Sequence, residues 1–161
     1  MIKLYNIVGI IYIILIFCLS IHFSQQKTNI TKNLAVAVTL ENSETKVSRY
    51  VELMTAIRKV ESNDDCSKIG KVGELGCYQI RECCWIDALE HDPSIGGEYE
   101  DVIDREYAEK CIYAYWDRYA TEKRLGRPVT DEDRAKIHNG GPNGYKKTAT
   151  IKYWNKIKEL L

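Results

Sequence analysis

The feature that most constrains the fold is an apolar stripe at helical spacing that ends on an acidic residue. The stripe consists of Val47, Tyr50, Val51, Met54 and Ile57. Glu61 follows four positions later on the same face, where a carboxylate costs free energy unless a partner or a function compensates it. Asn63, Asp64 and Asp65 favour turns, so we expect a helix that begins near Val47 and ends here, with Glu61 at an opening of the core.

The N-terminus predicts a secretory signal sequence. Lys3 precedes an almost unbroken apolar run from Ile7 to Ile21, and small residues precede possible cleavage sites after Ser20 or near Ser24. The run is short for a membrane span, so we expect residues 1–24 to be a signal peptide and the mature protein to be secreted. We expect no stable membrane insertion after cleavage, and an uncleaved anchor is the alternative.

Composition limits the remainder to one domain. Residues 25–46 are polar apart from Leu34 to Leu40 and carry no helical stripe, so we interpret them as a linker before a domain over residues 47–161. The formal net charge is zero, which gives no argument for nucleic acid as a partner. Acidic residues concentrate in 82–109 and basic residues in 134–161, either as solvated faces or as a basic flank that approaches an anionic polymer.

Cysteine usage fits a secreted protein. Removal of Cys18 with the signal leaves Cys66, Cys77, Cys83, Cys84 and Cys111. Disulfides of undetermined connectivity are expected, and an odd number leaves at least one cysteine free, buried or intermolecular. Without a C-x-x-C pair a zinc site is not expected, and we expect neither a metal nor a cofactor.

The remaining patterns predict a mainly helical α+β fold. The glycine-rich stretch 66–80 suits a small β-hairpin or an irregular ribbon. Helices are expected over 81–89, after a cap at Asp104, from a near capping box of Thr130 and Asp133 through Ile137, and over 151–161.

Two motifs could carry chemistry. Glu61 is either a helix-terminal glutamate bonded to an amide or arginine, or a desolvated general acid of the kind glycosidases use. The loop that contains His138, Asn139 and Gly140 is either a helix C-cap, with Gly140 left-handed, or a backbone surface that approaches a sugar closely. Most aromatic residues are core residues, but Tyr78 and Trp85 could stack on sugar faces.

From Ile57 to Trp154 the chain resembles a cysteine-poor member of the invertebrate-type lysozymes, the destabilase family. The matching pieces are "VES", "LGCYQI", "WID", "CIYAYWDRYA", "IHNGGPNGY" and "T-x-x-YW", in the family's order. The resemblance implies a lysozyme-like fold and hydrolysis of the β-1,4 bond between N-acetylmuramic acid and N-acetylglucosamine in bacterial peptidoglycan. It implies that Glu61 is the proton donor, and that the residues that bind substrate are Tyr78, Gln79, Arg81, Trp85, Asp87, Tyr115, His138, Asn139 and Gly140.

One position departs from the family pattern. The family has a second catalytic aspartate between "ES" and "YQI", where the best alignment places Lys71. Possible substitutes are Glu74, Asp64 and Asp65, and Glu74 is favoured because it lies on the ribbon that should face the helix end. The alternative function is a catalytically weak or inactive peptidoglycan-binding immune protein on the same scaffold.

Overall fold

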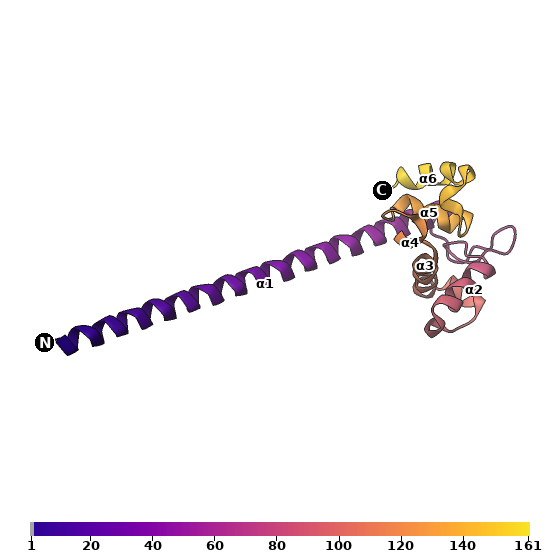
Figure 1. Cartoon of the computed structure of the whole chain (residues 1–161). Coiled ribbons are helices and arrows are strands. Elements are labelled where there is room, and N and C mark those ends of the chain that lie inside the picture. The colour runs from indigo at the N-terminus through magenta and orange to yellow at the C-terminus, as the bar shows by residue number, and fades with distance from the viewer. Residues whose placement is uncertain (1) are drawn as a thin grey trace. The chain divides into compact units, whose positions relative to one another are not determined.

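The computed structural model describes the backbone of residues 2–161, and the side chains of that range except for 2–21, 28–30, 42, 43 and 46. It is almost entirely helical (Figure 1). The elements are α1 (Ile2–Ser62), α2 (Glu82–His91), η1 (Pro93–Ile95), η2 (Tyr99–Ile103), α3 (Arg105–Tyr119), α4 (Glu122–Leu125), α5 (Asp131–Gly140), η3 (Gly144–Lys146), η4 (Thr148–Thr150) and α6 (Ile151–Lys158).

The chain divides into two units, Met1–Ser48 and Arg49–Leu161. The segment 25–46, predicted to be a linker without a helical stripe, is helical, because α1 continues through these residues. The segment contains no proline or glycine that would interrupt a helix. Every side chain described between residues 22 and 45 is exposed.

The apolar run Ile7–Ile21 lies among the residues whose side chains are not described, so the signal peptide stays a prediction. Among the residues that could be searched, no helix has the length and apolar character that crossing a bilayer requires.

The core of the second unit forms around the last turns of α1. Leu53, Met54 and Ile57 are fully or almost fully buried, whereas Val51 is 58% exposed. Val47, another member of the predicted stripe, is 62% exposed, so the stripe is wrong at both valines. The buried face instead includes Leu53 and Ala56, which are three positions apart and widen the stripe toward the other helices.

The predicted helix caps are confirmed. The Asp104 carboxylate accepts a hydrogen bond from the Tyr107 amide at 2.8 Å at the start of α3. Thr130 and Asp133 form a reciprocal capping box at the start of α5. The positive φ at the end of α5 belongs to Gly141 (78°) rather than to Gly140. Helix α2 packs against α3, and α5 packs against α6.

The glycine-rich segment between α1 and α2 is an irregular ribbon. No strand forms within residues 2–161, so the predicted hairpin is not confirmed, although Leu75 makes isolated antiparallel bridges to Ile69 and Ile80. Positive φ values at Gly73, Gly76 and Gln79 interrupt the extended backbone that a strand needs.

No disulfide joins the described cysteines, so the predicted bridges are not confirmed. Cys77 is fully buried and lies beside Cys66. Burial, together with the neighbouring Cys66 thiol, raises the pKa of Cys77 to about 12. The Cys77 thiol is therefore protonated and a poor nucleophile at neutral pH.

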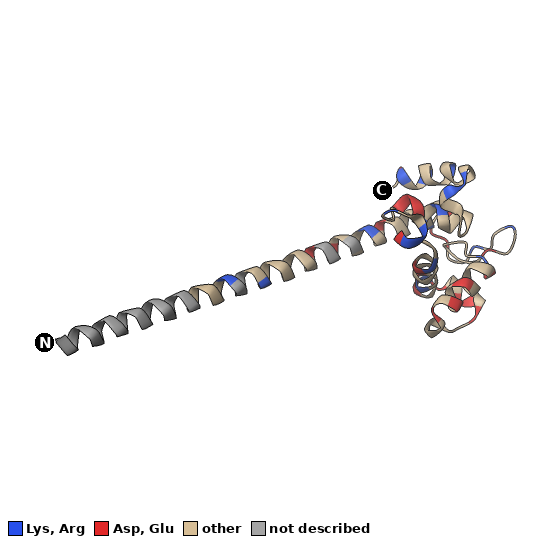
Figure 2. Ribbon diagram, viewed as in Figure 1, with Lys and Arg blue, Asp and Glu red and all other residues tan. Residues whose placement is uncertain are grey.

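The charge asymmetry expected from the sequence is visible on the second unit. Acidic residues concentrate in α2 and η2, and basic residues occur along α6 (Figure 2).

Candidate active-site cleft

Most of the predicted site residues line one cleft of about 1000 Å³. It lies between the end of α1, the ribbon, and parts of α2, α3 and α5. The predicted residues that line it are Glu61, Glu74, Gln79, Arg81, Asp87, Tyr115, His138, Asn139 and Gly140. Residues far apart in the sequence thus contribute to a single concave surface, as a polymer-binding site requires.

Glu61 lies in the last turn of α1, with 19% of its side chain exposed. Its backbone is held on two sides. The Lys68 ammonium donates to the Glu61 carbonyl, and the buried Ser62 hydroxyl donates to the Cys77 carbonyl at 2.9 Å. The carboxyl group therefore reaches the cleft from a fixed helix end and is partly shielded from water.

His138, on α5, was predicted as a substrate-binding residue, and the structure places it beside Glu61. Its Nε2 lies 3.0 Å from the Tyr78 carbonyl and 3.7 Å from Glu61 Oε1. A carbonyl only accepts, so Nε2 carries a proton and donates it to Tyr78, and 3.7 Å is too long for a second hydrogen bond. Burial lowers the pKa of His138, and the Glu61 charge and the Tyr78 carbonyl oppose this only in part. His138 is thus a neutral ring at neutral pH.

Glu74 lines the cleft together with the carboxylates of Glu61 and Asp87. It accepts hydrogen bonds from Arg81 at 3.1 and 3.2 Å and from the Val72 amide at 3.2 Å. Burial acts to raise the pKa of Glu74, but backbone amides and Arg81 outweigh it and hold this pKa below its usual range. Glu74 is consequently a charged, well-tethered carboxylate.

The other candidate carboxylates have local partners. Asp64 accepts from Arg58 Nε at 2.6 Å, and Asp65 accepts from the amide and hydroxyl of Ser67 at 2.9 and 2.7 Å. Neither lines the cleft, whereas Lys71 does. The structure therefore brings Glu74, and not Asp64 or Asp65, to the same surface as Glu61.

Two predicted sugar-stacking residues do not line the cleft. Tyr78 is fully buried, and its hydroxyl donates to Glu109 at 2.6 Å and accepts from Arg58 at 3.0 Å. The Trp85 indole donates to the Tyr107 hydroxyl at 2.8 Å and packs 6.1 Å from Tyr99. The stacking prediction is wrong for Tyr78, because internal polar partners hold the ring in the core; Trp85 is likewise bonded away from the cleft.

The wall opposite the ribbon is tightly built. The Asp87 carboxylate accepts from the Tyr119 hydroxyl at 2.9 Å and lies 3.5 Å from Arg118. A Cβ atom on Gly140 would lie 2.6 Å from the Thr150 methyl group, so only glycine fits there. The Lys147 ammonium donates to the Gly140 carbonyl at 2.5 Å.

Sequence reasoning missed the cationic residues of the cleft. Lys68 and Lys147 line it together with the predicted Arg81, and Lys71 was considered only as a replaced acid. The basic composition of 134–161 was the available signal for Lys147. Cations among acids make the surface suitable for a substrate that carries carboxylate groups.

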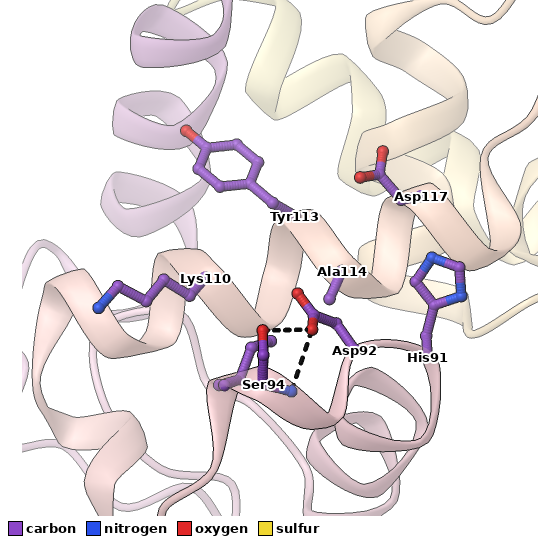
Figure 3. Close-up of a pocket in the computed structure, with 8 residues that line it drawn as sticks. His91, Asp92, Ser94, Lys110, Tyr113, Ala114 and Asp117 are labelled. Atoms are coloured by element: carbon purple, nitrogen blue, oxygen red, sulfur yellow. Dashed lines mark hydrogen bonds between the residues drawn. The ribbon is translucent and has the colours of Figure 1, made fainter.

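A second hollow of about 520 Å³ lies between the end of α2, η1 and α3 (Figure 3). Its Asp92 carboxylate accepts from the amide and hydroxyl of Ser94 at 3.1 and 2.6 Å, which caps η1. None of the predicted site residues lines this hollow.

Comparison with known proteins identifies the family to which the chain is similar. The Destabilase family matches residues 45–160. The lysozyme of Meretrix lusoria is 36% identical over 113 residues, which are 66% of this chain and 86% of that protein. Invertebrate-type lysozyme 6 of Caenorhabditis elegans is 34% identical over 137 residues, or 79% and 92%.

A solved structure shares the fold. The crystal structure of Aeromonas hydrophila PliI in complex with Meretrix lusoria lysozyme matches with a TM-score of 0.58 at 33% identity. The match covers 67% of this chain and 87% of that chain. The predicted lysozyme-like helical fold and the predicted family resemblance are confirmed: the chain belongs to the Destabilase family.

Proposed function

We propose that the protein is a secreted, bacteriolytic glycoside hydrolase. It cleaves the β-1,4 bond between N-acetylmuramic acid and N-acetylglucosamine in peptidoglycan, with Glu61 as the proton donor. The observation that carries this proposal is the Glu61 carboxyl group, held at a fixed helix end and only 19% exposed in a cleft of about 1000 Å³. Membership of a family whose relatives are named lysozymes supports it.

In the proposed reaction Glu61 gives its proton to the glycosidic oxygen as the bond to the sugar breaks. The electron pair of that bond stays on the leaving oxygen, and positive charge develops on the sugar ring. The neutral His138 adds no positive charge that would favour early loss of the Glu61 proton. General acid catalysis of this kind is typically worth ~10²–10⁴-fold in rate.

Glu74 is the proposed second carboxylate. Its low pKa keeps it charged, as required of a group that stabilises the developing positive charge, forms a glycosyl intermediate or activates water. Its bonds to Arg81 fix its position but also neutralise part of its charge. Activity weaker than that of an enzyme with an unpaired aspartate is therefore expected.

The remaining cleft residues would bind the glycan. Gln79, Asp87 and Asn139 offer hydrogen bonds to hydroxyl and acetamido groups, and Tyr115 forms part of the wall. Lys71 and Lys147 suit the lactyl and peptide carboxylates that distinguish peptidoglycan from uncharged chitin.

The decisive experiment combines wall clearing with wall binding. Glu61→Gln keeps the side chain's shape but removes the transferable proton, so it should abolish clearing of bacterial walls while a pull-down on the same walls stays nearly unchanged. Glu159→Gln, which changes an exposed glutamate at the end of α6, is the matched control and should clear at the parent rate. Parent-rate clearing by Glu61→Gln would rule out Glu61 as the acid.

A binding protein without catalysis is the second candidate function. It is favoured by Lys71, a cation that lines the cleft where the resemblance leads one to expect an aspartate. In the same two assays this function predicts binding by the parent chain and no clearing.

A further inference from the structure

The Tyr153 hydroxyl on α6 is a buried polar group that the proposed mechanism leaves without a role. It is buried and has no hydrogen-bond partner among the residues whose side chains are described. A buried hydroxyl without a partner costs free energy, and such groups in folded proteins usually have a functional or structural reason.

Glu61 is the charged group that acts on this hydroxyl. Burial raises the pKa of Tyr153 well above its ordinary value, and the charge and hydrogen-bonding capacity of Glu61 raise it further. The phenol is therefore protonated at neutral pH. The hydroxyl makes no hydrogen bond of normal geometry, yet Glu61 is close enough to act on it.

The other donors around Glu61 already have acceptors. The His138 Nε2–H donates to the Tyr78 carbonyl, and the Lys68 ammonium donates to the main-chain carbonyl of Glu61. The further charged groups that line the cleft are Lys71, Glu74, Arg81, Asp87 and Lys147. Among these groups Tyr153 is the buried donor that has no competing partner.

We propose that Tyr153 is a positioning residue for Glu61: its hydroxyl donates a hydrogen bond to the carboxylate that forms as Glu61 gives up its proton. This inference rests on the proposed function. The proton moves from Glu61 to the glycosidic oxygen, the bond to the sugar breaks toward that oxygen, and Tyr153 keeps its own proton throughout. A donor placed beforehand, where charge develops, stabilises the transition state more than the ground state.

The contact is tested first by a titration that does not need activity. In the wild-type chain, the ¹³Cζ resonance of Tyr153 should shift as the Glu61 carboxyl titrates, and it should stay flat in Glu61→Gln. The titration of Glu61 can be measured from its ¹³Cδ resonance. In Tyr153→Phe the midpoint of this titration should move to higher pH, because the Glu61 carboxylate loses a hydrogen-bond donor. Tyr113→Phe, which changes a tyrosine on α3 away from the cleft, should leave it in place.

Kinetics on soluble wall fragments give the second readout. Tyr153→Phe should lower kcat by roughly 10-fold, as expected for a lost hydrogen bond to a charged group, with KM unchanged and the alkaline limb of the pH profile shifted upward. Because the Tyr153 hydroxyl has no hydrogen-bond partner in the resting protein, the thermal stability of Tyr153→Phe should equal or exceed that of the wild-type chain.

An unchanged Glu61 titration in Tyr153→Phe, or an effect on KM alone, would overturn the inference. A wild-type chain that clears no walls would refute the proposed function alone, since the titration still decides the contact.

Discussion

His138 should make the stability of the domain depend on pH in the mildly acidic range. Its side chain is 5% exposed, and burial holds its pKa below the ordinary value of about 6.5. Below pH ~6.5 the unfolded chain therefore binds a proton that the folded chain does not. The free energy of unfolding must fall as the pH falls, until the pH reaches the lowered pKa of the folded state.

The size of this change in the free energy of unfolding follows from the binding of one proton. Each pH unit within this window lowers the free energy of unfolding by at most about 1.4 kcal/mol. For a domain of this size that corresponds to roughly 5 °C in Tm per pH unit. The Glu61 charge opposes the shift, so the window is narrower in the wild-type chain than it would be without Glu61.

The assay compares wild type with His138→Gln by thermal unfolding from about pH 4.5 to pH 7.5. Glutamine can still donate to the Tyr78 carbonyl but does not titrate, so the curve of His138→Gln should be flatter below pH ~6.5. Lowered pKa values of acids such as Glu74 and Asp133 affect both proteins equally and cancel in the difference. The exposed Asn139 provides the control, since Asn139→Ala should weaken wall binding without changing Tm. Parallel curves for wild type and His138→Gln would refute this reasoning.

Two further predictions concern the second carboxylate and the cysteines. Glu74→Gln should lower hydrolysis by at least ~10-fold; a parent rate would exclude Glu74, and a gain in the separate variant Lys71→Asp would then identify position 71 as the functional one. Peptide mapping of the unreduced chain from an oxidising host should find Cys66 linked to the adjacent Cys77, and an odd number of free thiols that includes the exposed Cys83. An even thiol count, or an unlinked Cys66, would contradict the second prediction.

Local sequence signals predicted the helix ends well because a cap depends only on neighbouring residues. The Asp104 cap and the Thr130–Asp133 box are examples, since their partners lie three residues away. The same signals did not indicate the helix over residues 25–46, where the composition is polar and has no apolar stripe but contains no proline or glycine that would interrupt a helix. Periodicity also misplaced Val51, since it cannot tell how many neighbours surround a helix end.

The sequence motifs predicted which segments form the cleft, but they did not predict which side chains of those segments line it. Tyr78 and Gln79 are adjacent, yet Tyr78 is buried and Gln79 lines the cleft, because the backbone of the ribbon turns at Gln79 with a positive φ of 49°. A regular strand would have allowed the alternation of faces to be read from the sequence. Without one, the direction of each side chain depends on contacts made by residues elsewhere in the fold.

The same reasoning explains why the sequence reduced the candidates for the second carboxylate to three residues but could not identify one of them. Asp64 and Asp65 are closest to Glu61 along the chain, but Arg58 and Ser67, also local, bind them and turn them away from the cleft. Glu74 reaches the cleft because the ribbon folds back through the bridges of Leu75 and because Gly70 leaves room for its carboxylate, as a Cβ atom there would lie 2.2 Å from Glu74 Oε2. The entry of Glu74 into the cleft thus depends on a backbone turn and on the absence of a side chain at Gly70. This geometry makes Glu74→Gln more informative than any change at the two neighbouring aspartates.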